Sequence, residues 1–213
     1  MKVNGYALPW NRAIQIDGLW EMVRPNAVRI DTRNVRLCFM HEGHDYPLAQ
    51  TANGTLQLWN DAFGLAWAAD VDDAVGWKRA ALRTIGDGST SDCSVNFTFL
   101  QCNERDGLRV IEAADIDHVA VCARLNGAYG DEGANCWLED KPSDAFTRRL
   151  AQRWAAGASN RALSPGLALA NRSASAARLV AVPTCRPSAS PASSWRGKVP
   201  PSVDHVLRMA GRL

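Results

Sequence analysis

The residues of this chain that could carry out chemistry are a serine and two histidines, each in or at the end of a short apolar run: Ser94, His41 and His118. Peptide hydrolysis by a serine requires a base that removes the hydroxyl proton, a group that orients this base, and donors for the oxyanion. With Ser94 as nucleophile, the chain contains the skeleton of a serine hydrolase. The simpler alternative is a strand serine with two hydrogen-bonded structural histidines.

The run around the serine has the two-residue period of a β-strand. Ser94, Asn96 and Thr98 alternate with three apolar residues, so we expect the serine on the polar side of a strand whose other side packs in the core. His41 ends its own run, where a loop can open to substrate. No G-x-S-x-G sequence surrounds Ser94, which argues against an α/β-hydrolase.

Several segments outside these runs carry a family resemblance. They are residues 4–11, the run from His41 to Thr51, Gly64-Leu65, Gly86-Asp87-Gly88 and Cys93-Ser94-Val95-Asn96-Phe97. In order and spacing they resemble the prohead serine proteases of tailed bacteriophages, over about residues 4–137. This family is similar to the herpesvirus assemblins, serine proteases that use a Ser-His-His set on a closed β-barrel.

The resemblance assigns a role to each of the three residues. Ser94 matches the nucleophile and His41 the general base. His118 matches the third position, as in the assemblins, where many phage members carry Glu. A carboxylate, Asp115 or Asp117, is the alternative group that would orient the base.

The chain departs from the family pattern just after the serine, and it offers a candidate residue for binding the oxyanion. Asn96 and Thr98 stand where a Gly-Phe pair is commoner in the family, so we expect the chain after the nucleophile to differ in detail. Arg124 lies six residues past His118, and assemblin-like enzymes use an arginine-bearing loop at this place for the oxyanion. A surface arginine is the alternative.

The segment His41-Glu42-Gly43-His44-Asp45 resembles a metal-binding cluster but lacks the helical H-E-x-x-H frame. We therefore expect no metal, and no cofactor is implied. His44 would replace His41 as the base only if the assignment were displaced by three positions.

The apolar runs predict an α+β, β-rich fold, and the resemblance implies a compact assemblin-like β-barrel with peripheral helices. Expected strands are 3–8, 35–41, 55–59, 65–71, 94–101 and 108–123. Apolar residues at helical spacing predict a helix between Val71 and Gly86, and a second from residue 143 or 144 to about 156, with Gly157 as its stop.

The C-terminal part of the chain differs from the rest in composition. We expect a protease domain over residues 1–157 and a flexible Ala/Ser/Pro/Arg-rich tail over residues 158–213. Residues 141–213 contain 12 Lys and Arg against 2 Asp and Glu, whereas the whole chain has a formal net charge of only +2. Such a tail is expected to bind polyanions in a salt-dependent way.

The remaining composition bears on the compartment. No apolar run reaches the length of a signal peptide or a membrane span, so we expect no membrane and an intracellular location. The six cysteines form no C-x-x-C pair, and they are expected to be buried free thiols.

The resemblance implies a prohead maturation protease, a serine endopeptidase acting inside the assembling procapsid in the bacterial cytoplasm. Its substrates would be scaffold and major capsid-protein extensions, and its own tail, and its relatives imply a homodimer. The alternative function is a non-catalytic capsid assembly or scaffolding protein that binds shell or nucleic acid through the basic tail.

Overall fold

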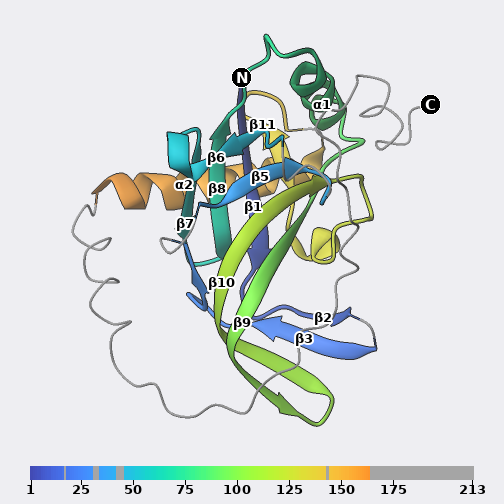
Figure 1. The fold of residues 1–213 in the computed structure, drawn as a ribbon, viewed down its shortest axis with the longest axis vertical. Coiled ribbons are helices and arrows are strands. Elements are labelled where there is room, and N and C mark those ends of the chain that lie inside the picture. The colour runs from blue at the N-terminus through green and yellow to red at the C-terminus, as the bar shows by residue number, and fades with distance from the viewer. Residues whose placement is uncertain (17, 31–33, 42–45, 143, 164–213) are drawn as a thin grey trace.

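The computed structural model describes residues 1–16, 18–30, 34–41, 46–142 and 144–163, which form two β-sheets and two α-helices (Figure 1). The four-stranded sheet has the order β11-β1-β8-β7, with bounds β1 Lys2–Pro9, β7 Leu56–Asn60, β8 Gly64–Asp70 and β11 Cys136–Leu138. The seven-stranded sheet contains β2 Ala13–Ile16, β3 Leu19–Val23, β4 Val28–Arg29, β5 Arg36–Phe39, β6 Ala49–Gln50, β9 Asp92–Arg105 and β10 Leu108–Cys122. The helices are α1 Gly76–Gly86 and α2 Ala145–Leu163, and two 3-10 turns span Thr51–Asn53 and Gly130–Glu132.

Strand β10 organises the larger sheet because it is paired on both edges. On one edge it pairs antiparallel with β9, forming the long curved hairpin of Figure 1. On the other edge it pairs parallel with β3, β4 and β5 in succession. Every strand of this sheet that carries a candidate catalytic residue is therefore β10 itself or its direct neighbour.

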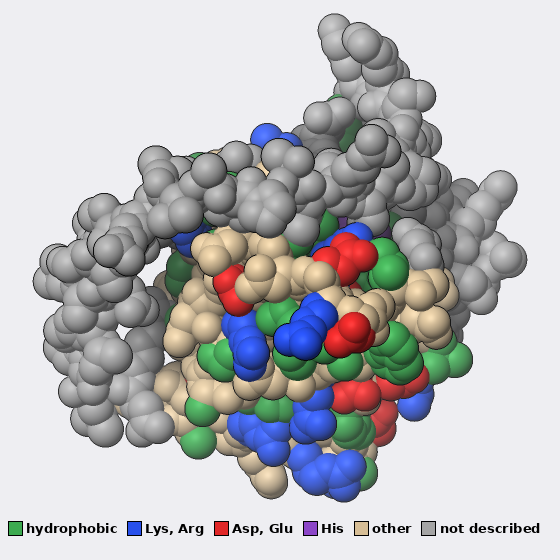
Figure 2. All heavy atoms as spheres, turned by 90° about the horizontal axis from the view of Figure 1, so that it is seen from below, with side chains coloured by type: hydrophobic (Ala, Val, Ile, Leu, Met, Phe, Trp, Pro, Cys, Tyr) green, Lys and Arg blue, Asp and Glu red, His purple; other side chains and the backbone are tan. Residues whose placement is uncertain are grey.

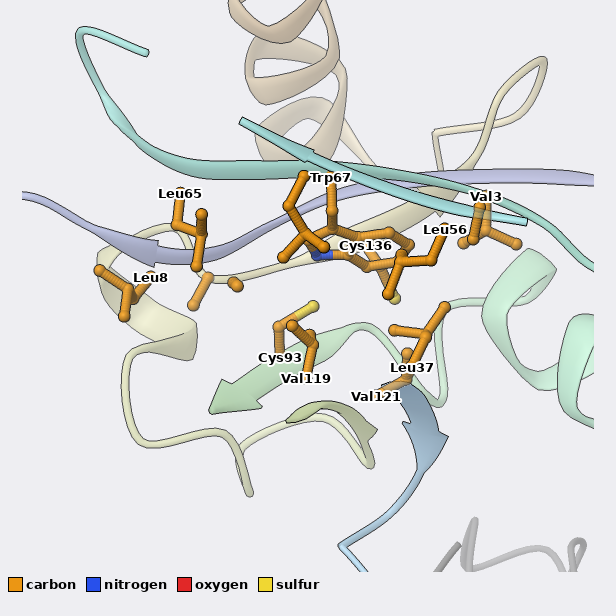
Figure 3. Close-up of a cluster of buried hydrophobic side chains, with 14 of the residues drawn as sticks. Val3, Leu8, Leu37, Leu56, Leu65, Trp67, Cys93, Val119, Val121 and Cys136 are labelled. Atoms are coloured by element: carbon orange, nitrogen blue, oxygen red, sulfur yellow. The ribbon is translucent and has the colours of Figure 1, made fainter. Parts of the chain in front are cut away.

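The core lies between the two sheets (Figure 3). Leu37, Cys93, Val119 and Val121 point from β5, β9 and β10 toward the residues of the four-stranded sheet, among them Trp67. All five side chains are completely buried. Because side chains alternate along a strand, the neighbours of these residues lie on the opposite face of the larger sheet.

The expected closed barrel is wrong, since the structure consists of two open sheets. Backbone hydrogen bonds join the two sheets beside Asp92, where Cys93 N–H donates to Ala134 O at 2.6 Å and Cys136 N–H donates to Ser91 O at 2.8 Å. This contact is a single isolated bridge, Asp92 with Asn135. Because β11 is only three residues long and is paired with β1, it does not extend the bridge into a continuous ladder with β9.

The expected strands are all present as β1, β5, β7, β8, β9 and β10, and the β-rich fold with peripheral helices is confirmed. The short strands β2, β3, β4, β6 and β11 were not predicted, because runs of two to five residues carry little periodicity.

Helix α1 ends at Gly86 as predicted, but α2 continues past Gly157 to Leu163, so the predicted stop is wrong. A Cβ at Gly157 would lie 2.7 Å from Asp61 Oδ2, so the glycine permits a close approach instead of ending the helix. The helix crosses the outer face of the four-stranded sheet (Figure 1), and Trp154 Nε1–H donates to Trp67 O at 3.1 Å. The rest of the predicted tail, residues 164–213, lies outside the described residues.

Four cysteines, Cys38, Cys93, Cys122 and Cys136, are buried and free as predicted. Cys102 is also buried, but it is not among the free thiols. Cys185 lies outside the described residues. Among the helices of the described ranges, none is long and apolar enough to cross a membrane.

Candidate active site

The pairing of β9 with β10 places the serine and one histidine on the same face of the larger sheet. Ser94 lies opposite Ala120, and His118 lies opposite Asn96. Cys93 and Val119 point into the core (Figure 3), so their neighbours Ser94 and His118 lie on the other face. Diagonal neighbours of this kind are about 7–8 Å apart at Cα, within reach of an intervening side chain.

His41 reaches this face through a sharp turn after β5. Met40 has a positive φ of 55°. Its backbone N–H donates to Val121 O at 2.9 Å. The turn places His41 Nδ1 2.9 Å from His118 Nε2, with the two rings in an edge-to-face arrangement. The two histidines, 77 positions apart in the chain, therefore share a hydrogen bond.

His118 is held from its other ring nitrogen as well. Its Nδ1 lies 3.0 Å from Asp117 Oδ2. The His118 side chain is 2% exposed, whereas that of Asp117 is 47% exposed. Each ring nitrogen of the buried imidazole thus has a hydrogen-bond partner, as is usual for a buried polar side chain.

Ser94 is half-buried, and within the described ranges its hydroxyl makes no hydrogen bond to either histidine. Catalytic hydrogen bonds are often long in a free enzyme and tighten when substrate binds. The structure thus gathers the three predicted residues on one face without closing the contact between the serine and the base.

The other predicted residues have different surroundings. Arg124 N–H donates to Ser89 O at 3.0 Å, and the guanidinium lies 3.9 Å from the Asp144 carboxylate. His44 lies outside the described residues. Asp115, an alternative orienting carboxylate, forms a close ion pair with Arg29, whose Nη2 lies 2.6 Å from its Oδ1. In the ranges that the structure describes, no group of three His, Cys, Asp or Glu side chains is arranged to hold a metal.

Asp92 is a feature of the site that the sequence reasoning missed. Its buried carboxylate accepts the backbone N–H of Leu125 at 2.7 Å and an N–H of Asn135 at 3.0 Å. It thereby holds the loop after β10 against the first residue of the nucleophile strand. Its isolation was the available signal, because it is the only acidic residue between Asp87 and Glu104.

Burial raises the pKa of Asp92 above its ordinary value of 3.8, although the N–H groups of Gly127 and Leu125 act in the opposite direction. The first effect is the larger one. The folded protein therefore retains this proton at pH values where the unfolded chain has lost it.

A model of the caudovirus prohead serine protease family matches residues 1–140. The chain belongs to this family. It is accordingly a serine protease of the phage prohead type. A search of curated protein sequences found no match. The matched range of this prohead protease contains all three candidate catalytic residues and Arg124, and it ends before α2.

The pKa of Asp92 predicts how one substitution depends on pH. Because the native pKa is raised, the stabilising contribution of this group is complete below pH 3.8 and is lost as the pH rises through the native pKa. The unfolding free energy of wild type should therefore exceed that of Asp92→Asn by the largest amount near pH 4, and this excess should shrink toward pH 7. Urea unfolding at several pH values measures both free energies, with exposed Asp73→Asn as control. A difference that instead grows with pH would show that the ionised carboxylate is the favoured form.

Proposed function

We propose that this prohead protease is a Ser-His-His endopeptidase in which Ser94 is the nucleophile, His41 the general base and His118 the group that orients the base. The observation that supports the proposal is the 2.9 Å contact between the two histidines on the face that bears Ser94. The family match supports a serine nucleophile, and Ser94 lies on the same sheet face as His118.

The arrangement allows the following chemistry. His41 uses one ring nitrogen, Nδ1, toward His118, so Nε2 is the atom that takes the hydroxyl proton as Ser94 Oγ attacks the scissile carbonyl. The resulting imidazolium is stabilised by the hydrogen bond to His118. The same proton then passes to the leaving amine, and a water molecule activated by His41 releases the acyl group from Ser94.

Arg124 could donate hydrogen bonds to the oxyanion only after the Arg124 side chain leaves Asp144. Hydrogen bonds from Thr147 lower the pKa of Asp144, with a smaller contribution from Arg124, so this carboxyl is ionised and competes for the guanidinium. The oxyanion that forms on the attacked carbonyl would supply the negative charge that replaces the Asp144 carboxylate.

The family name supports prohead proteins as substrates, and we propose that the enzyme cleaves scaffold and major capsid-protein extensions, and its own C-terminal segment, inside the assembling procapsid in the bacterial cytoplasm. A homodimer is part of this proposal. Removal of such extensions fits an endopeptidase whose candidate site lies on an open sheet face.

We assign polyanion binding to the segment after α2. Residues 164–213 contain seven Lys and Arg and one Asp. On the face of the body shown in Figure 2, basic and acidic side chains instead lie next to one another. A basic segment that follows a body with a face of mixed charge fits a salt-sensitive tether to the shell or its contents.

Substitution of the three residues tests the catalytic assignment. Ser94→Ala and His41→Ala should each lower kcat/KM for a capsid-protein substrate by a factor on the order of 10⁴ or more, because each removes an essential step. His118→Ala should cost less, about tenfold to a few hundredfold, because it orients the base without touching substrate. Thr98→Ala, which deletes a hydroxyl on the same strand, is the control and should cleave normally. Wild-type cleavage by Ser94→Ala would refute the assignment, and no cleavage by wild type would favour the assembly function.

Truncation after Leu163 tests the tether. Every candidate catalytic residue and both helices remain, so peptidase activity should stay within a few-fold of the full chain. Co-sedimentation with procapsids should fall, and that of the full chain should weaken as salt rises. Unchanged co-sedimentation of the truncated form would remove the tethering role.

A further inference from the structure

The strand that supplies His118 is irregular at this residue. Ile116 lies opposite Phe97 and His118 lies opposite Asn96, so Asp117 is an extra residue in β10 with no counterpart in β9. This is a β-bulge, a feature that often re-aims a side chain beside an active site.

Burial shows the same irregularity. Ile116 and Val119 both belong to the core, although they are an odd number of positions apart. In a regular strand, residues this far apart would lie on opposite faces. Asp117 and His118 are the two residues between them, and the bulge allows the Asp117 carboxylate to reach the buried imidazole of its neighbour at 3.0 Å.

The two contacts of His118 determine where its proton lies. An ionised carboxylate only accepts hydrogen bonds, so the Nδ1 that contacts Asp117 must carry the hydrogen. In the neutral imidazole, Nε2 is then an acceptor, and it must receive the Nδ1–H of His41. His41 consequently has its unprotonated nitrogen at Nε2, where the serine proton has to go.

The opposite tautomer would block catalysis. If His118 carried its hydrogen at Nε2, it would donate to His41 Nδ1, and neutral His41 would then carry its own hydrogen at Nε2. That nitrogen could not accept the serine proton. An imidazole as third member has no intrinsic preference strong enough to prevent this, whereas an ionised carboxylate accepts hydrogen bonds only.

The other titratable groups near this pair do not take over the role. Burial raises the pKa of Cys38 to about 12, so its thiol stays neutral at physiological pH. Arg36, opposite His118 on β5, carries a positive charge and donates hydrogen bonds without accepting them. On β9, the residue opposite His118 is Asn96, which does not titrate.

We propose that Asp117 is a positioning residue that fixes the tautomer of His118 and, through it, that of His41, so that the site works as a chain from Asp117 through both histidines to Ser94. The inference rests on the proposed function of Ser94 and His41. Asp117 touches neither substrate nor the reacting atoms.

Two variants of Asp117 and one control test the role. Asp117→Asn keeps the size of the side chain, but its amide can donate to Nδ1 as well as accept from it, so kcat should fall about 10- to 100-fold with KM nearly unchanged. Asp117→Glu retains an acceptor-only carboxylate at a half-exposed position, so kcat should stay within a few-fold of wild type. Asp106→Asn, in the exposed turn between β9 and β10, is the control and should match wild type in activity and Tm.

A spectroscopic readout separates positioning from a merely structural effect. Imidazole ¹⁵N NMR in the Ser94→Ala background should show His118 protonated at Nδ1 and not at Nε2, and Asp117→Asn should change this to a mixture. Full activity of Asp117→Asn, an unchanged tautomer in this variant, or a Glu variant as slow as the Asn variant would each overturn the inference. The proposed function would survive all three results, since the results that defeat it are an active Ser94→Ala variant or a wild-type protein that does not cleave.

Discussion

The pairing of β10 on both of its edges is the constraint on which the rest of the structure depends. One edge fixes β9 and therefore Ser94, the other fixes β5 and therefore the turn that carries His41, and β10 itself supplies His118. Ser94 and His118 are thereby placed by the backbone hydrogen bonds of paired strands, and His41 by the turn that follows β5, in which Met40 N–H donates to Val121 O. Positioning by strands gives a site the rigidity that catalysis requires.

The core and the site use opposite faces of the same three strands. Leu37, Cys93 and Val119 are completely buried between the sheets, so the alternation of side chains leaves the outer face to the polar residues. Asp92 stabilises one end of these strands, because its buried carboxylate accepts a hydrogen bond from the loop after β10 and so holds this loop at the start of β9. Loosening the sheet packing would therefore displace the candidate catalytic groups as well.

The sequence allowed the main strands and both helices to be predicted, because strand and helix periodicity are local signals. It also pointed to Ser94, His41 and His118, whose catalytic roles stay predictions. It did not reveal the bulge at Asp117, the positive φ of Met40 or the passage of α2 beyond Gly157. Each of these depends on a partner distant in the chain, such as Asn96, Val121 or Asp61. The open sheets were missed for the same reason, since closure depends on how far β11 and β9 pair.

The central claim, that Ser94 is a nucleophile activated by His41, is tested most directly by covalent labelling. The full-length protein would be treated with a fluorophosphonate, which phosphonylates activated serines, and the modified peptide would be identified by mass spectrometry. The account predicts a single adduct at Ser94 that forms far more slowly in His41→Ala, because the hydroxyl then has no base. Labelling of another serine, or equally fast labelling of Ser94 in His41→Ala, would contradict it.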